Sequence, residues 1–173
     1  MTPACANEAG WEALAAPDTH AIMRHALAPG TGDPAGFTLG DCSTQRNLDD
    51  RGRAQARRIG EAIRGAGVTV GRVLSSQWCR SSETAELLGL GPVEDLPALN
   101  SFFDDRSQRG PQTEALRAFL ADIAADETLM LVTHQVNISA LTGRGTSSGE
   151  VVVFRYGEDG TVEVKARIRT PAR

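Results

Sequence analysis

Short apolar runs of the length of a buried strand are the feature that most constrains the fold of this chain. Two such runs lie at residues 20–23 and 129–133, and a third, more mixed segment at residues 68–75 is also expected to form a strand. Continuous apolar runs are typical of parallel strands that helices cover on both faces. Residues 93–99 are expected to add a short edge strand.

Helical patterns lie between these runs. Apolar residues recur at helical spacing in residues 48–64, 80–88 and 112–125, and a short helical turn is expected at residues 137–141. Near the end of the chain, two strand-like segments flank residues 157–160 and predict an antiparallel hairpin. Strands that alternate with helices predict the α/β class, here a three-layer α/β/α sandwich with a mostly parallel central sheet.

The length and charge of the chain limit its organisation and its partners. Its 173 residues fit one domain, residues 1–173, in which residues 1–18 are expected to form an N-terminal arm. The net charge of -4 argues against nucleic acid as a partner, because nucleic-acid binding favours a basic face. No apolar run reaches the roughly 18 residues of a transmembrane helix, so no membrane span is expected. The oligomeric state is left open.

The first residues leave two locations open. Residues 1–8 have neither the basic start nor the apolar core of a signal peptide, which predicts a cytoplasmic protein. A methionine followed by small residues also fits a chain whose signal peptide has been removed, and such a protein would be periplasmic or otherwise exported.

Three cysteines raise the question of a disulfide. Cys42 and Cys79 each lie near a segment that carries candidate site residues, so a bond between them is one hypothesis. Buried free thiols are the alternative.

Cationic and imidazole side chains follow the predicted strands at the points where they end. Arg24 and His25 end the first strand, Arg80 follows the second, and His134 follows the third. In open α/β sheets, ligands bind outside the carboxyl ends of the strands, so these side chains are expected to converge. Arginine binds phosphate through its planar fork, and a neutral histidine can act as a nucleophile. A second histidine can donate a hydrogen bond as charge grows on phosphate.

Other polar side chains have simpler interpretations. His20 has no companion motif and is expected on the surface. A zinc site made of His25, His134 and Cys42 is compatible with ligand type, but no Cys-x-x-Cys or His-x-x-x-His spacing supports it. A solvated helix face is expected for a group of arginines, of which the first could also reach a substrate: Arg46, Arg51, Arg53, Arg57 and Arg58.

Several of these segments together resemble the motifs of the histidine phosphatase superfamily, the phosphoglycerate mutase-like proteins. Residues 24–26 read Arg-His-Ala, where the family has Arg-His-Gly, and residues 75–80 match its Ser-Ser-x-x-x-Arg motif. Residues 48–56 resemble the start of the family's helix, which reads Leu-Thr-x-x-Gly-x-x-Gln-Ala. His134 lies where the family has its second histidine, and the likeness runs in order over residues 20–155.

The resemblance implies a reaction. His25 would become phosphorylated, Arg24, Arg80 and His134 would bind the phosphate around it, and no metal or cofactor would be needed. Water would then hydrolyse the phosphoenzyme, which makes the expected activity that of a metal-independent phosphomonoester hydrolase, a histidine phosphatase, on a small phosphorylated substrate. A phosphomutase of the same fold is one alternative. A non-catalytic module that binds phosphate or a phosphoprotein is another.

Departures from the family pattern leave the general acid open. Gln135 lies where the acid-phosphatase branch has an acid, and an amide cannot donate a proton as an acid does. Asp33 and Asp105, the latter beside Asp104, are the candidates. The short chain resembles the small phosphatases of the family, which include a phosphohistidine type and a lipopolysaccharide-heptose type. Residues 41–47 and the Arg-His-Ala variant favour the heptose type, whose members are often exported.

Overall fold

A six-stranded sheet forms the centre of the protein, as a computed structural model that describes residues 3–124 and 126–173 shows. The sheet order is β3-β2-β4-β1-β5-β6. The first four strands in this order pair in parallel, and β5 pairs antiparallel with both β1 and β6, so the sheet is mostly parallel, as the sequence predicts. The strands are β1 (His20–Arg24), β2 (Arg72–Ser75), β3 (Val93–Asp95), β4 (Leu129–Thr133), β5 (Val151–Tyr156) and β6 (Val162–Ile168).

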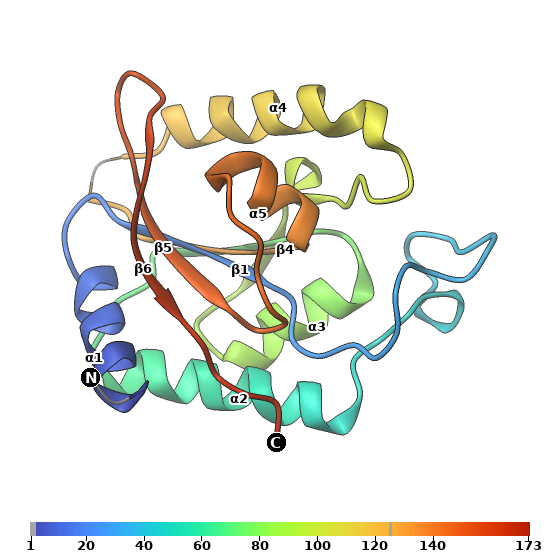
Figure 1. Cartoon of the computed structure of the whole chain (residues 1–173), viewed down its shortest axis with the longest axis horizontal. Helices are drawn as coiled ribbons and strands as arrows, with labels where there is room; N and C mark the ends of the chain where they lie inside the picture. The colour runs from blue at the N-terminus through green and yellow to red at the C-terminus, as the bar shows by residue number, and fades with distance from the viewer. Residues whose placement is uncertain (1–2, 125) are drawn as a thin grey trace.

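Helices cover both faces of this sheet. In Figure 1, α4 and α5 lie above the sheet and α2 and α3 lie below it, with α1 at the edge that β6 forms. The three-layer arrangement is therefore the predicted one. The helices are α1 (Pro3–Leu14), α2 (Asp50–Gly65), α3 (Cys79–Leu88), α4 (Arg109–Ala121) and α5 (Gln135–Thr142).

The two faces of the central strands contact two different apolar cores. In β1, Met23 packs into the core that α1, α2 and α3 close, whereas Ile22 packs into the core that α4 and α5 close. In β4, Met130 and Leu131 divide between the two cores in the same way. Because alternate residues must be apolar on both sides, a central strand is a continuous apolar run.

Several elements begin or end elsewhere than the sequence predicts. β2 starts only at Arg72, and β3 stops at Asp95 because Pro97 begins a 3₁₀ turn. α4 begins at Arg109 and takes Pro111 into its first turn, where the missing N–H has no helical partner to lose. The prediction that His20 lies on the surface is wrong: its ring is 6% exposed and packs on Phe154.

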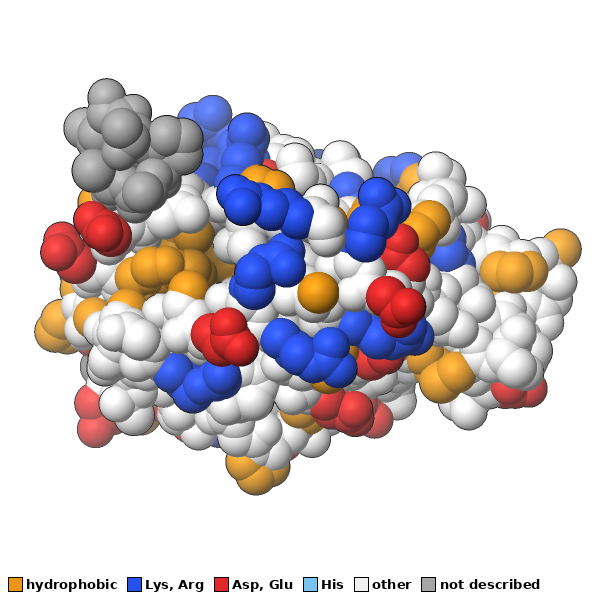
Figure 2. Space-filling model, turned by 90° about the horizontal axis from the view of Figure 1, so that it is seen from below, with side chains coloured by type: hydrophobic (Ala, Val, Ile, Leu, Met, Phe, Trp, Pro, Cys, Tyr) orange, Lys and Arg blue, Asp and Glu red, His pale blue; other side chains and the backbone are white. Residues whose placement is uncertain are grey.

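The arginines of α2 lie on the outer face of the protein, as expected. Figure 2 shows this face, where Lys and Arg side chains gather with acidic ones between them. Arg53 pairs with Glu83 at 2.6 Å and with Asp50 at 3.0 Å, while Arg57 is exposed. Arg46, in contrast, lies in the loop before this helix.

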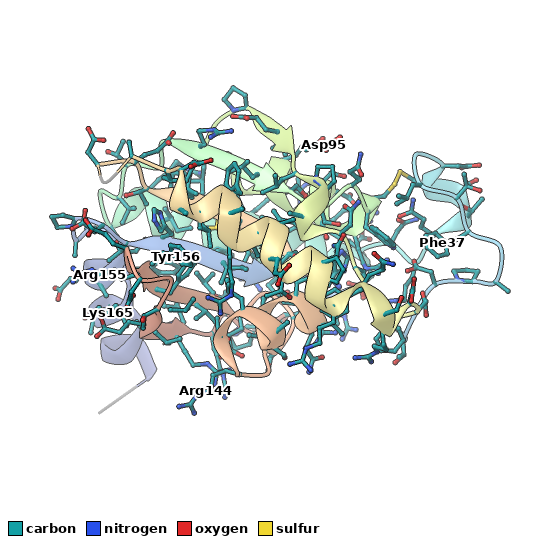
Figure 3. All side chains as sticks on the ribbon, turned by 90° about the horizontal axis from the view of Figure 1, so that it is seen from above. Phe37, Asp95, Arg144, Arg155, Tyr156 and Lys165 are labelled. Carbon is teal, nitrogen blue, oxygen red and sulfur yellow. A yellow bond between two sulfur atoms is a disulfide. The ribbon has the colours of Figure 1, made fainter. Side chains whose placement is uncertain are left out.

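A long loop follows β1, and a disulfide attaches it to the start of α3. Cys42 is bonded to Cys79, the first residue of α3, so the disulfide hypothesis is the one that holds (Figure 3). The backbone N–H of Cys79 also donates to Oε1 of Gln45, at 3.0 Å. Farther out, the ring of Phe37 lies 5.6 Å from that of Trp78. The loop is thus attached to the start of α3 at several points.

Candidate active site

Parallel pairing of β1 with β4 brings the two histidines to one edge of the sheet. Arg24 lies in register with Thr133, and the backbone N–H of His25 donates to the Thr133 carbonyl at 2.9 Å. His134 is the next residue of the neighbouring strand. The two imidazole rings lie 5.5 Å apart, at 65° to one another.

His25 is a buried and neutral imidazole. Its Nδ1 lies 2.8 Å from the carbonyl oxygen of Ala26, which can only accept, so Nδ1 carries the proton and Nε2 keeps its lone pair. Nε of Arg80 donates to this Nε2 at 3.3 Å. Burial, and after it the positive charge of Arg80, lowers the pKa of His25 from 6.5 to about 3. A lone pair on an unprotonated nitrogen is what a nucleophile requires.

His134 is buried beside it and is also neutral. Burial, followed by the nearby His25 and Arg80, holds its pKa far below the ordinary value of 6.5. Its Nε2 lies 2.8 Å from Oγ of Ser76, and this Oγ accepts from the backbone N–H of Trp78 at 3.2 Å. The hydroxyl proton of Ser76 is then free to bond Nε2, which leaves the imidazole proton on Nδ1.

Arg80 is held by Asp33, a residue of the long loop. The guanidinium donates to both carboxylate oxygens, from Nη1 to Oδ1 at 2.7 Å and from Nη2 to Oδ2 at 3.0 Å. Oδ2 also accepts from the Trp78 indole at 3.0 Å, and Oδ1 from the Arg46 backbone N–H at 3.0 Å. Burial raises the pKa of Asp33, but the hydrogen bonds from Arg80 and Arg46 together outweigh it and lower the pKa. Asp33 is therefore a carboxylate with four donors.

Two further arginines lie beside these groups. Arg24 donates from Nη1 to Oε1 of Gln135 and to the Thr146 carbonyl, both at 3.2 Å, while its buried Nε bonds to none of the described residues. Arg46 donates to the carbonyls of Gly32 and Ala28. Burial, and then Arg80, lowers the pKa of both Arg24 and Arg46. An unused donor and crowded positive charge suit an anion.

These groups line one cleft of about 450 Å³. Its lining includes five arginines against one acidic residue, Asp33, although the chain as a whole carries a net charge of -4. The expected site residues in it are Arg24, His25, Asp33, Arg80 and His134, and the arginines that sequence reasoning missed or left open are Arg46, Arg106 and Arg109.

Asp105 is placed differently from the other candidates. It is absent from the cleft lining and begins a 3₁₀ turn, where Oδ1 accepts from the backbone N–H of Ser107 at 3.1 Å and from its hydroxyl at 2.6 Å. These bonds lower the pKa of the exposed Asp105 carboxyl. Asp104, its neighbour, is exposed as well.

The start of α2 supports the backbone that follows His25. A Cβ on Gly52 would lie 2.0 Å from the carbonyl oxygen of Leu27, so the helix approaches this strand end as only glycine allows. Gln55 accepts from the Leu27 N–H at 2.9 Å and donates to the Ser148 carbonyl at 3.0 Å. These contacts give a physical reason for the glycine and the glutamine of the family's helix motif.

Among the residues that the structure describes, no cluster of three His, Cys, Asp or Glu side chains could hold a metal ion. No helix in the same part of the chain has the length and apolarity that a membrane crossing needs.

A neutral, buried imidazole among arginines, at the carboxyl ends of parallel strands, suits nucleophilic attack on a phosphate group. The comparisons with known proteins agree with this chemistry. The sequence model of the histidine phosphatase superfamily (branch 1) matches residues 22–103. No curated protein sequence matches the chain.

Solved structures of phosphatases share the fold. The structure of the protein histidine phosphatase SixA complexed with tungstate is 22% identical, covers 87% of this chain and 96% of its own, and has a TM-score of 0.60. The α-ribazole phosphatase from Shigella flexneri is 16% identical, covers 88% and 99%, and has a TM-score of 0.63. These solved structures share the fold of the chain, and the superfamily model matches just under half of its residues.

Proposed function

We propose that this protein is a metal-independent phosphomonoester hydrolase that works through a phosphohistidine intermediate on His25. The observation that carries the proposal is the state of His25, a neutral imidazole with Nε2 unprotonated inside a cleft lined by arginines. Nε2 attacks phosphorus, the bond to the leaving oxygen breaks, and water then cleaves the phosphorus–nitrogen bond to release inorganic phosphate.

The neighbouring groups bind the phosphoryl group and stabilise its charge. Arg80 is directed at the reacting nitrogen through its Nε, and the buried Nε of Arg24 is an unused donor. The Nδ1 proton of His134 supplies a further donor, since its Nε2 is bonded to Ser76. Donors fixed in a site with little water lower the barrier when negative charge grows on the phosphoryl oxygens.

The proton for the leaving group has two candidate donors, Asp33 and Asp105. Asp33 is in the cleft but is bound to Arg80 as a carboxylate, and Asp105 lies outside the cleft lining. Leaving groups that need little protonation should therefore react best. Such groups include nitrophenolate, and also the protonated imidazole of a phosphohistidine, which the name of the neighbour SixA suggests as a second substrate class.

The test is turnover of p-nitrophenyl phosphate with His25→Ala as the control. Stoichiometric release of inorganic phosphate supports hydrolysis over the phosphomutase alternative. Brief reaction with ³²P-labelled substrate should label the protein in a form that is stable in base and lost in acid, as phosphohistidine is. Binding of phosphate without any turnover or labelling would instead support the non-catalytic module.

We also propose that the protein is exported and belongs with the small phosphatases that resemble lipopolysaccharide-heptose phosphatases. The disulfide between Cys42 and Cys79 supports a periplasmic location, because disulfides persist mainly in oxidising compartments. Fractionation of cells that express the full gene product, with the thiols alkylated before lysis, tests both the location and the bond. Reduced protein confined to the cytoplasm would contradict this proposal.

A further inference from the structure

The rim of the cleft carries two arginines that the proposed reaction does not use. Arg106 lies in the 3₁₀ turn Arg106–Gln108, and Arg109 is the first residue of α4. Both side chains line the cleft and both residues are exposed. They belong to a different segment of the chain from the arginines around His25.

Six arginines of the described chain pair with a carboxylate, and these two, like several others, do not. Among the described residues, no carboxylate lies within ion-pair distance of Arg106 or Arg109, whereas Arg72, for example, pairs with Glu94 at 2.7 Å. Nε of Arg106 donates to the Phe103 carbonyl at 3.1 Å, which leaves both terminal nitrogens of its fork unused. Among the described residues, the Arg109 guanidinium forms no hydrogen bond, and only its backbone carbonyl accepts one, from the Thr113 hydroxyl.

The segment that carries them is fixed relative to the inner site. The side chain of Asn100 accepts from the Gln77 backbone N–H at 2.9 Å and donates to the Gln77 side chain at 2.8 Å. Phe102 is 3% exposed and anchors the loop. Because Gln77 lies just before α3, the rim keeps its distance from Arg80, and a ligand would not have to order it.

Phe103 joins the rim to the long loop on the other side of the cleft. Its ring lies against Gly32, where a Cβ would be 3.8 Å from the ring atom Cε1. The guanidinium of Arg106 lies over this ring, 5.1 Å from its centre. Phe103 is still 41% exposed, which is unusual for an apolar side chain of this protein. The rim and the Asp33–Arg80 pair therefore share one continuous cleft, and its volume of about 450 Å³ exceeds what one phosphoryl group fills.

We infer that Arg106 and Arg109 form a second anion subsite, so that the preferred small substrate carries a second anionic group, phosphate or carboxylate, beyond the phosphate that reacts. The exposed ring of Phe103 contacts the part of the substrate that joins the two groups. This inference rests on the proposed function, since it assigns the first phosphate to His25.

The test measures inhibition of p-nitrophenyl phosphate hydrolysis by alkanediol bisphosphates of increasing chain length. Each bisphosphate is compared with the monophosphate of the same diol. The inhibition constant of the monophosphate is divided by that of the bisphosphate within one protein, so that changes in turnover cancel. For the chain length that spans the cleft, the bisphosphate should inhibit about fivefold better, since an exposed ion pair contributes little and two are formed. The preference should shrink as ionic strength rises.

Two variants connect this ratio to the rim. In Arg106→Gln/Arg109→Gln the ratio should fall to about two, the statistical advantage of two equivalent phosphates at a single site. If this variant does not fold, Arg109→Gln alone should lower the ratio, and it should fold because the guanidinium holds no other part of the described structure. Arg144→Gln is the matched control, because Arg144 is exposed, lies outside the cleft lining and points away from the body of the protein in Figure 3.

The outcomes separate the two proposals. A ratio of no more than about two in the wild-type protein at every chain length would overturn the subsite, and so would an equal fall of the ratio in Arg144→Gln. Failure of the wild-type protein to hydrolyse p-nitrophenyl phosphate would overturn the proposed function instead. The inhibition constants would then be replaced by calorimetric affinities, which test the subsite in the same way.

Discussion

The carboxylate of Asp33 holds the guanidinium of Arg80 through two parallel hydrogen bonds of 2.7 and 3.0 Å. The carboxylate uses both terminal nitrogens of the fork, and the third nitrogen, Nε, is left facing His25 at 3.3 Å. Two-point contact fixes the plane of a guanidinium as well as its position. The geometry therefore favours a positioning role for Asp33 over proton donation.

Asp33→Asn should lower kcat/KM by about 10- to 100-fold, the range expected when a charged hydrogen bond is lost. Because the variant loses the orientation of Arg80, the loss should be similar for aryl phosphates with good and with poor leaving groups. The measurement is a plot of rate against leaving-group pKa for both proteins. Asp105→Asn is measured in the same way, and a loss confined to poor leaving groups in that variant would identify Asp105 as the general acid. A loss concentrated on poor leaving groups would identify Asp33 as the general acid after all.

The two buried histidines should make the protein less stable in mild acid. The pKa of His25 is about 3 in the folded chain and near 6.5 in the unfolded chain, so between these values only the unfolded chain binds the proton. The stabilisation is thus complete above pH 6.5 and is lost as the pH falls toward 3, by about 1.4 kcal/mol per pH unit for each such histidine. Urea denaturation at several pH values measures the slope.

His25→Gln provides the comparison, because a side chain that does not titrate removes one proton from the difference. Its unfolding free energy should depend less steeply on pH below 6.5 than that of the wild-type protein. If the two slopes agree, His25 is protonated in the folded chain, and the proposed nucleophile is not ready to react.

Reduction of the Cys42–Cys79 bond should lower both stability and activity. The bond closes a loop with a sequence separation of 37 residues, for which loop entropy predicts about 3–4 kcal/mol of stabilisation. It also holds the long loop, with Asp33, against the helix that starts beside Arg80. Thermal unfolding and kcat/KM with and without a reductant measure the two effects. The Cys42→Ser/Cys79→Ser protein should match the reduced enzyme and should not respond to reductant, and a response there would assign the effect to another group.

Gly52→Ala should destabilise the protein by about 1–3 kcal/mol, the usual range for an overpacked site. The added methyl group would lie 2.0 Å from the Leu27 carbonyl oxygen, two residues after His25, so kcat/KM should fall as well. Gly65→Ala, at the end of the same helix, is the matched control. A Cβ there meets no atom within 4 Å, and the change should stabilise the protein by about 0.4–1 kcal/mol. Equal effects in the two variants would mean that the approach to Leu27 is not tight.

The sheet and the convergence of four site residues could be predicted because they depend on local patterns. Apolar runs mark β1 and β4, and the residue after each strand must lie at the same edge when the strands are parallel. His20 was misjudged because its burial depends on Phe154, which belongs to a strand from the far end of the chain. No local pattern reports such a contact.

The outer part of the cleft could not be predicted for a similar reason. Arg46 carries the same charge as its neighbours in α2, but a loop path that the disulfide and Asp33 fix turns it inward. Arg106 and Arg109 lie in a segment whose sequence indicates only a polar loop. Their relation to His25 depends on the bonds between Asn100 and Gln77, and a side-chain amide pair of this kind has no signature in the sequence.

The position of β1 has a consequence for synthesis of the protein. Its parallel neighbour β4 begins at Leu129 and its antiparallel neighbour β5 at Val151, so both are synthesised more than a hundred residues after β1. Until these strands have been made, His25 has neither the second histidine nor its two neighbouring strands around it. The cleft around His25 can therefore assemble only after this delay, and a chain terminated before β4 would carry His25 without the groups that surround it.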